Sequence, residues 1–130
     1  MASHRSDLSR ARGLGSAKHG VGAWIGEKIT SVALVPLVLW AVYSGLMLSV
    51  ADYQTAVTWL HVPLHAVLLA SLIAVGFWHM HAGLRVVVED YVDSGLTKSA
   101  VLLVNLFVCL LGAALAIFCI LKVAILGGAY

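Results

Sequence analysis

Four histidines lie on or beside one long apolar stretch in the middle of the sequence: His61, His65, His79 and His81. Ionisable side chains are rare inside membrane-spanning segments and usually have a function there, so these histidines are the first candidates for chemistry. A neutral imidazole can serve as an axial ligand of haem iron. His61 and His65 fall at one end of the stretch, where contact with water alone can account for them.

His79 shares a helical face with two other residues of the run FWHMHAGLRVVVEDY. At about 100° per residue, Gly83 lies about 40° round the helix from His79, and Asp90 about 20° round. Tyr91 follows one step off this stripe. If Asp90 and Tyr91 mark the edge of the membrane, His79 lies roughly 16 Å further along the axis, near the centre of the bilayer.

This stripe permits two interpretations of His79. A glycine one turn away lets a flat macrocycle approach, so the imidazole can ligate a haem iron. Alternatively, His79 is a buried histidine that hydrogen-bonds to a neighbouring helix. His81 points about 200° away from the stripe and cannot ligate the same iron, so it faces another helix or a polar cavity.

A two-haem arrangement is a further alternative, because His65 and His79 are fourteen residues apart and only about 40° out of alignment. It requires a second helix with two histidines. The sequence has no such helix, so a homodimer would have to supply it, with two haems in each assembled unit.

The composition predicts that these residues belong to a membrane protein. The 130 residues are 62% hydrophobic and 11% charged, with a mean hydropathy of +0.99, which is too little charge to cover a soluble surface. Long unbroken apolar stretches predict an all-α integral membrane protein with three transmembrane helices, at about residues 29–51, 63–90 and 99–126. We expect a membrane domain over 27–130 after a polar, basic segment, 1–26, that is unlike a signal peptide.

Individual residues suggest how the spans begin and pack. Pro63 suits the first turn of the second span. Asn105, the only strongly polar side chain deep in the third span, is expected to hydrogen-bond to another helix, and Gly112 suits close helix contact. Cys109 and Cys119 lie roughly 15 Å apart on this helix, too far for a disulfide, and are expected to be packing residues.

The distribution of charge predicts the orientation. Five of the eight Lys and Arg residues precede the first span and Lys98 falls on the same side, whereas the loop from Asp52 to His61 has none. The positive-inside rule therefore places the N-terminus in the cytoplasm and the C-terminus outside. That loop has room for a short surface helix. A formal net charge of +2 is too small to indicate nucleic acid as a partner.

The pattern His79-x-x-x-Gly83-x-x-x-x-x-x-Asp90-Tyr91 on a second transmembrane helix resembles the signature of SdhD-type hydrophobic membrane anchor subunits of succinate dehydrogenase (complex II). The upstream run RARGLGSAKHGVGAW is similar to the N-terminal segment of alphaproteobacterial members. Three spans, a basic tail and the chain length agree with this family, so the resemblance covers nearly the whole chain.

The resemblance implies a subunit of a heteromeric helical bundle in the bacterial inner membrane, acting in electron transfer from succinate to ubiquinone. The implied partners are a second, cytochrome b556-type membrane anchor, an iron–sulfur subunit, a flavoprotein subunit and membrane lipids. This chain would be a non-autonomous subunit of the succinate:quinone oxidoreductase. It has neither a flavin-binding fingerprint nor a cysteine cluster for an iron–sulfur centre, so it cannot oxidise succinate by itself.

The resemblance also implies roles for four residues. His79 corresponds to an axial ligand of haem b, whose other ligand is a histidine of the second anchor subunit. Tyr91 corresponds to the tyrosine that hydrogen-bonds to a quinone carbonyl, and Asp90 to the acid beside it, which is structural or part of proton delivery. Lys28 falls where the family usually has an arginine that pairs with a haem propionate; lysine keeps the charge but loses the bidentate fork.

Two other interpretations stay open. Taken without the resemblance, Tyr91 is first an aromatic anchor at the membrane interface. The chain as a whole could also be a haem-free anchor or assembly protein of a fumarate reductase-type complex, in which the polar residues only pack helices. Membranes enriched in such a protein would be colourless and would lack quinone-dependent activity.

Overall fold

The computed structural model describes residues 4, 6–13 and 20–127, so Arg5 and Lys18 of the basic segment lie outside the described residues. The helices of the described part are α1 (Asp7–Ala11), α2 (Val21–Leu48), α3 (Tyr53–His61), α4 (Pro63–Tyr91) and α5 (Gly95–Leu126). Helices α2, α4 and α5 are long and apolar enough to cross a membrane, which confirms the three predicted spans. The short α3 lies in the loop where a surface helix was expected.

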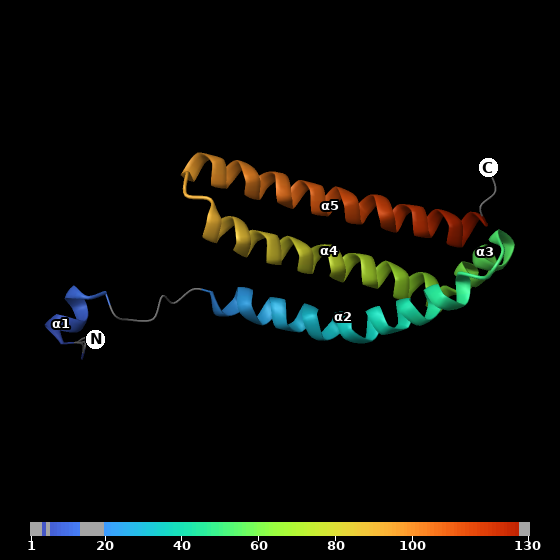
Figure 1. The fold of residues 1–130 in the computed structure, drawn as a ribbon, viewed down its shortest axis with the longest axis horizontal. Helices are drawn as coiled ribbons and strands as arrows, with labels where there is room; N and C mark the ends of the chain where they lie inside the picture. Colours follow the sequence, from blue (N-terminus) through green and yellow to red (C-terminus); the bar gives the residue numbers. More distant parts are fainter. Residues whose placement is uncertain (1–3, 5, 14–19, 128–130) are drawn as a thin grey trace.

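Helix α4 is the central element of the membrane part. Figure 1 shows α2, α4 and α5 side by side in a row, with α4 in the middle and packed against both neighbours. A three-residue connection, 92–94, joins α4 to α5. At the opposite end, α3 follows α2 and contacts α4 and α5. The side chains of α4 therefore face α2, α5 or one of the two open sides of the row.

Helix α2 begins at Val21, eight residues before the expected start of the first span at residue 29. Gly20 precedes it with φ of +105°, a left-handed conformation that glycine adopts without a steric penalty. No proline interrupts the next two turns, so the helix starts inside the segment that was expected to be polar. It then continues through Pro36, and Figure 1 shows that it is bowed, as expected of a helix with an internal proline.

Aromatic rings tie the three elements together at the α3 end. The rings of Trp59 on α3 and His65 on α4 stack with centroids 4.1 Å apart, and Trp40 on α2 lies 5.8 Å from Trp59. Nδ1 of His65 also donates to the carbonyl oxygen of Trp59 at 2.8 Å. His65 is therefore packed at a helix junction and is not simply a solvated residue. Pro63 occupies the first turn of α4, as predicted.

Little of the described chain is buried. The five buried residues among those described are Ser44, Val57, Ala66, Asn105 and Cys109. Cys109 is buried as expected, whereas Cys119 is exposed, so the prediction that it packs is wrong for this chain by itself. Most large apolar side chains are likewise exposed, which leaves a surface for lipid or for other membrane helices to cover.

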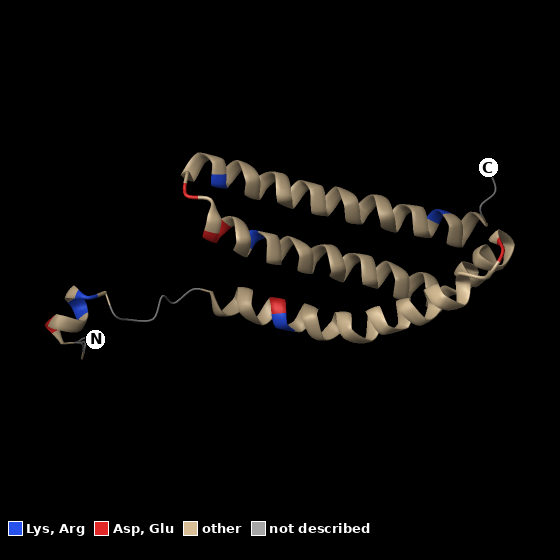
Figure 2. Cartoon of the chain, in the orientation of Figure 1, with Lys and Arg blue, Asp and Glu red and all other residues tan. Residues whose placement is uncertain are grey.

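Charged residues gather near the ends of the long helices (Figure 2). At the α4–α5 connection, Nε of Arg85 donates to Oε1 of Glu89 at 2.7 Å. Nζ of Lys98 on α5 donates to the carbonyl oxygen of Glu89 at 2.9 Å, and this bond satisfies one of the carbonyls left free at the end of α4. The polar end of the row thus lies where the sequence placed the membrane edge.

Candidate functional site

His79 points from α4 to α2. Its Nδ1 lies 2.9 Å from Oγ1 of Thr30, and the imidazole is half-buried. The Thr30 hydroxyl also lies 3.0 Å from the carbonyl oxygens of both Gly26 and Glu27, one turn earlier in α2. The neighbouring helix therefore holds the imidazole through one of its two nitrogens.

The second nitrogen of His79, Nε2, makes no hydrogen bond within the described part of the chain. Because that part contains no buried side-chain nitrogen or oxygen without a partner, Nε2 is accessible from outside. The ring borders an open hollow of about 440 Å³ along α2, whose other lining residues are Ser31, Leu34, Val35, Val38 and Leu39. An accessible ring nitrogen thus lies beside a mostly apolar space.

Gly83 leaves further room on the same face of α4. A Cβ atom built at this glycine would have no heavy atom within 4 Å. One helical turn from His79, the backbone is therefore uncovered and a flat group can approach it closely. The stripe identified in the sequence lies on an accessible surface of α4.

Asp90 and Tyr91 lie in the last turn of α4, and both are exposed. The Tyr91 side chain is 83% exposed, so nearly all of its ring and hydroxyl is available to another molecule. Neither side chain has a hydrogen bond or ion pair within the described ranges. Tyr91 is about 18 Å from His79 along the helix axis. The structure therefore places the pair and the histidine on one helix at different depths.

Lys28 lies on the exposed surface of α2, with Nζ 5.7 Å from the centroid of the Trp24 ring. It precedes Thr30 by two residues and so lies about 200° round the helix from the side chain that meets His79. The structure does not bring Lys28 next to His79.

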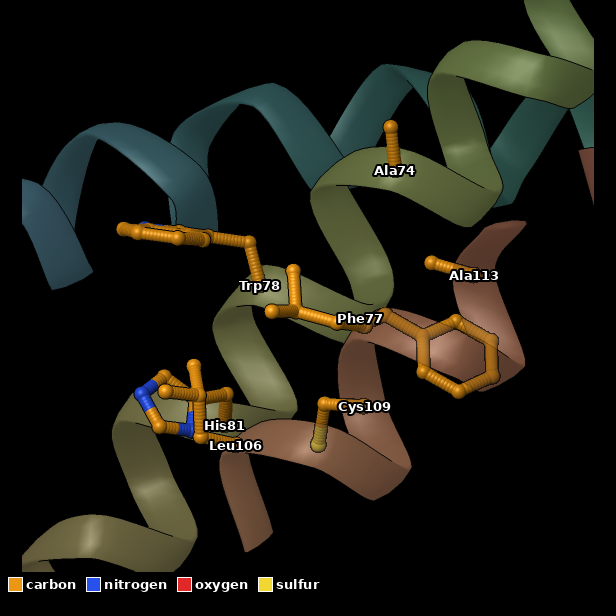
Figure 3. Close-up of a pocket in the computed structure, with 8 residues that line it drawn as sticks. Ala74, Phe77, Trp78, His81, Leu106, Cys109 and Ala113 are labelled. Atoms are coloured by element: carbon orange, nitrogen blue, oxygen red, sulfur yellow. The ribbon is translucent and has the colours of Figure 1, made fainter. Parts of the chain in front are cut away.

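His81 faces the opposite neighbour, α5, and contacts Asn105. Nδ2 of Asn105 lies 3.0 Å from Nδ1 of His81 and donates to the carbonyl oxygen of the same residue at 3.1 Å. Sγ of Cys109 donates to Oδ1 of Asn105 at 3.4 Å. Figure 3 shows His81 and Cys109 at the wall of a small cavity of about 50 Å³, together with Phe77 and Trp78. The predictions that Asn105 bonds another helix and that His81 faces away from His79 are confirmed.

Thr30 is a partner of His79 that no pattern in the sequence predicts. A threonine within an apolar helix has no distinctive pattern, and its role depends on the register of α2 against α4, 49 residues away in the chain. The only available signal was that Thr30 is one of few hydroxyl residues in the first span.

Comparisons with known proteins agree with this architecture. Residues 2–120 match the family described as the succinate dehydrogenase/fumarate reductase transmembrane subunit. The succinate dehydrogenase hydrophobic membrane anchor subunit of Rickettsia bellii is 30% identical over 104 residues, which cover 79% of this chain and 83% of that protein. The subunit of the same description from Rickettsia conorii is 29% identical over 105 residues. No solved structure gives a significant match. The chain therefore belongs to the succinate dehydrogenase/fumarate reductase transmembrane subunit family, as an SdhD-type hydrophobic membrane anchor of the alphaproteobacterial kind.

Proposed function

We propose that this chain is the membrane anchor subunit of a succinate:quinone oxidoreductase that supplies one axial ligand of haem b and part of the site where ubiquinone is reduced. The observation that supports this most strongly is the environment of His79. A histidine that only packs helices would also bond to Thr30 through Nδ1. It would not need an accessible Nε2 beside an apolar hollow and an uncovered glycine.

The residues around His79 fit a haem. The apolar side chains that line the hollow suit the faces of the macrocycle, and Gly83 leaves space at the helix surface. The other haem ligand would come from another chain, which we take to be the second, cytochrome b556-type anchor. The bound haem would supply a one-electron redox centre in the membrane.

The last turn of α4 suits a quinone site. We assign to the Tyr91 hydroxyl a hydrogen bond to one carbonyl oxygen of ubiquinone, since it is a donor and almost fully exposed. Reduction to the quinol takes up two electrons and two protons, and the exposed carboxylate of Asp90 would pass protons from water. The site would be completed by the partner subunits.

Membership of a succinate:quinone oxidoreductase also implies the source of the electrons and the orientation of the chain in the membrane. Electrons would come from succinate through the flavoprotein and iron–sulfur subunits. The Asp90–Tyr91 end of α4 would face the cytoplasm because Lys98 and the basic N-terminal residues lie on that side, which puts the C-terminus in the periplasm of the bacterial inner membrane. Lys28 would pair with a haem propionate at this surface. The exposed apolar sides of the helix row would meet the second anchor and lipid.

The test is the optical spectrum of the purified complex with His79→Leu. We expect the low-spin haem b bands of the reduced-minus-oxidised spectrum to disappear while flavin and iron–sulfur clusters are retained. His61→Leu, at the exposed end of α3, should keep the bands. An unchanged haem spectrum in His79→Leu would contradict the ligand assignment. A wild-type complex without haem would favour the haem-free, fumarate reductase-type anchor.

A further inference from the structure

The hydroxyl of Thr30 has three polar neighbours but only one proton to donate. The carbonyl oxygens of Gly26 and Glu27, each at 3.0 Å, can only accept a hydrogen bond. The third neighbour, Nδ1 of His79 at 2.9 Å, accepts or donates according to the tautomer of the imidazole. The position of a single proton on Thr30 therefore decides which nitrogen of His79 carries hydrogen.

Two proton arrangements are consistent with these distances. In the first, Thr30 donates to a carbonyl of its own helix, as helical threonines commonly do, and accepts from Nδ1–H of His79. In the second, Thr30 donates to Nδ1, and Nε2 carries the hydrogen, with no acceptor among the described residues. The first forms a continuous chain from imidazole to hydroxyl to carbonyl, in which each bond polarises the next. The second gives up the bonds from the Thr30 hydroxyl to the carbonyl oxygens of Gly26 and Glu27, and with them this continuous chain.

The first arrangement leaves a lone pair on Nε2, the accessible nitrogen. A metal ion needs this form, because a nitrogen that carries hydrogen cannot bind it. Imidazole ligands in proteins generally donate their other N–H to a fixed acceptor, which orients the ring and raises its basicity. The Thr30 hydroxyl, itself anchored to the backbone of α2, is an acceptor of this kind.

We propose that Thr30 is a positioning residue for the haem ligand: it accepts the Nδ1–H of His79, fixes the tautomer with a free Nε2 lone pair, and aims that lone pair at the iron. This inference rests on the proposed function. It adds that the affinity and the redox potential of the haem depend on a hydroxyl in α2 that does not touch the haem.

The experiment compares the complete purified complex carrying Thr30→Val, Thr30→Ala or Thr30→Ser. Valine keeps the shape of the side chain and removes the hydroxyl, alanine removes it without filling the space, and serine retains it. Thr58→Val is the control, because Thr58 makes the same bond to the carbonyl four residues earlier, Gln54, and has no hydrogen bond to a histidine among the described residues. Flavin content reports assembly. Haem content per flavin and the midpoint potential of the haem report ligation.

We expect Thr30→Val and Thr30→Ala to lower haem affinity by roughly 10–100-fold, seen as haem lost during dilution. In the haem that remains, a less basic imidazole stabilises the oxidised iron less. If the preference of the imidazole for oxidised over reduced iron falls tenfold, the midpoint potential rises by about 59 mV. Thr30→Ser and Thr58→Val should match the wild type in both measurements.

Three results would overturn the inference, and they differ in meaning. If haem is present and Thr30→Val and Thr30→Ala keep the wild-type haem content and potential, Thr30 only packs α2 against α4, while the proposed function stands. If the wild-type complex contains no haem, the proposed function fails and the inference fails with it. Equal haem loss in Thr58→Val and Thr30→Val would also contradict a specific role of Thr30.

Discussion

Asn105 on α5 gives both of its amide protons to His81 on α4, one to Nδ1 at 3.0 Å and one to the backbone carbonyl oxygen at 3.1 Å. Nδ1 of His81 therefore accepts, and Nε2 of this residue carries the proton. Oδ1 of Asn105 accepts in turn from Cys109. Two histidines two residues apart on α4 thus have different partners, one on each neighbouring helix.

Replacing Asn105 should loosen α5 from α4. Asn105→Leu fills a similar volume but removes both bonds to His81, and interhelical hydrogen bonds in membranes are worth about 0.6 kcal/mol on average. We expect a small fall in the melting temperature of the complex in mild detergent. Ser99→Ala, which removes a bond within α5 alone, should leave it unchanged. Equal melting temperatures for the two variants would mean that the bonds between Asn105 and His81 do not stabilise the packing of α5 against α4.

Gly112 lies at a close contact between α4 and α5. A Cβ atom built there would lie 2.6 Å from Cε1 of Phe77, so Gly112→Ala requires the aromatic ring or the helix to move. Overpacking of this kind costs about 1–3 kcal/mol. We expect a lower unfolding free energy in detergent, whereas Gly76→Ala, with nothing within 4 Å of its Cβ, should be neutral or slightly stabilising. If Gly112→Ala leaves the unfolding free energy unchanged, the close packing of Gly112 against Phe77 is contradicted.

Several features of the fold could be predicted from the sequence because each has a local signal. Three apolar stretches predicted the three spans, and Pro63 predicted the start of α4. Asn105, an isolated amide in an apolar helix, was predicted to hydrogen-bond to another helix. The first span was predicted to start at residue 29 after a polar segment over 1–26, whereas α2 already begins at Val21. Helix α2 includes the end of that segment, since polar residues at a membrane surface need not end a helix.

Only the part of the site that has a local sequence signal could be predicted. The stripe of His79 and Gly83 follows from helical periodicity, so sequence alone places both on one face. The contact with Thr30 requires the register of α2 against α4, which no local pattern encodes. The exposure of Cys119 was missed because its neighbours on α5 are as apolar as those of Cys109, although only Cys109 of the two is buried.

Helix α3 should become less stable in acid. The side chain and backbone N–H of Thr55 hydrogen-bond to Asp52, which lowers the pKa of this carboxyl group below its ordinary value of 3.8. The charged cap is therefore fully stabilising above pH 3.8 and is lost as the pH falls through the lowered pKa. Hydrogen exchange over 53–61, corrected for intrinsic rates, should rise only in strong acid. In Asp52→Asn this pH dependence should vanish; if it persists, another group is responsible.

Adding a side chain at Gly83 should interfere with haem binding and leave the chain itself intact. Gly83→Ala meets no atom of this chain within 4 Å, and alanine favours the helix more than glycine does. If the macrocycle approaches the backbone there, the new methyl group should weaken haem binding by about 1–3 kcal/mol. Haem content per flavin measures this loss. Gly45→Ala on α2, equally uncrowded, is the control, and equal haem content in both variants would remove Gly83 from the site.

Removing the Tyr91 hydroxyl should slow quinone reduction selectively. Tyr91→Phe keeps the exposed ring, and with it any role as an interface anchor, but deletes the proposed bond to the quinone carbonyl. Losing one such bond costs about 1 kcal/mol, or roughly fivefold in kcat/KM for quinone. Succinate oxidation with a soluble dye that accepts electrons before the quinone should be unaffected. Tyr53→Phe, an exposed tyrosine at the opposite end of the row, is the control. If both variants reduce quinone at the wild-type rate, Tyr91 only anchors α4 at the membrane surface, and the quinone-binding group must lie on another subunit.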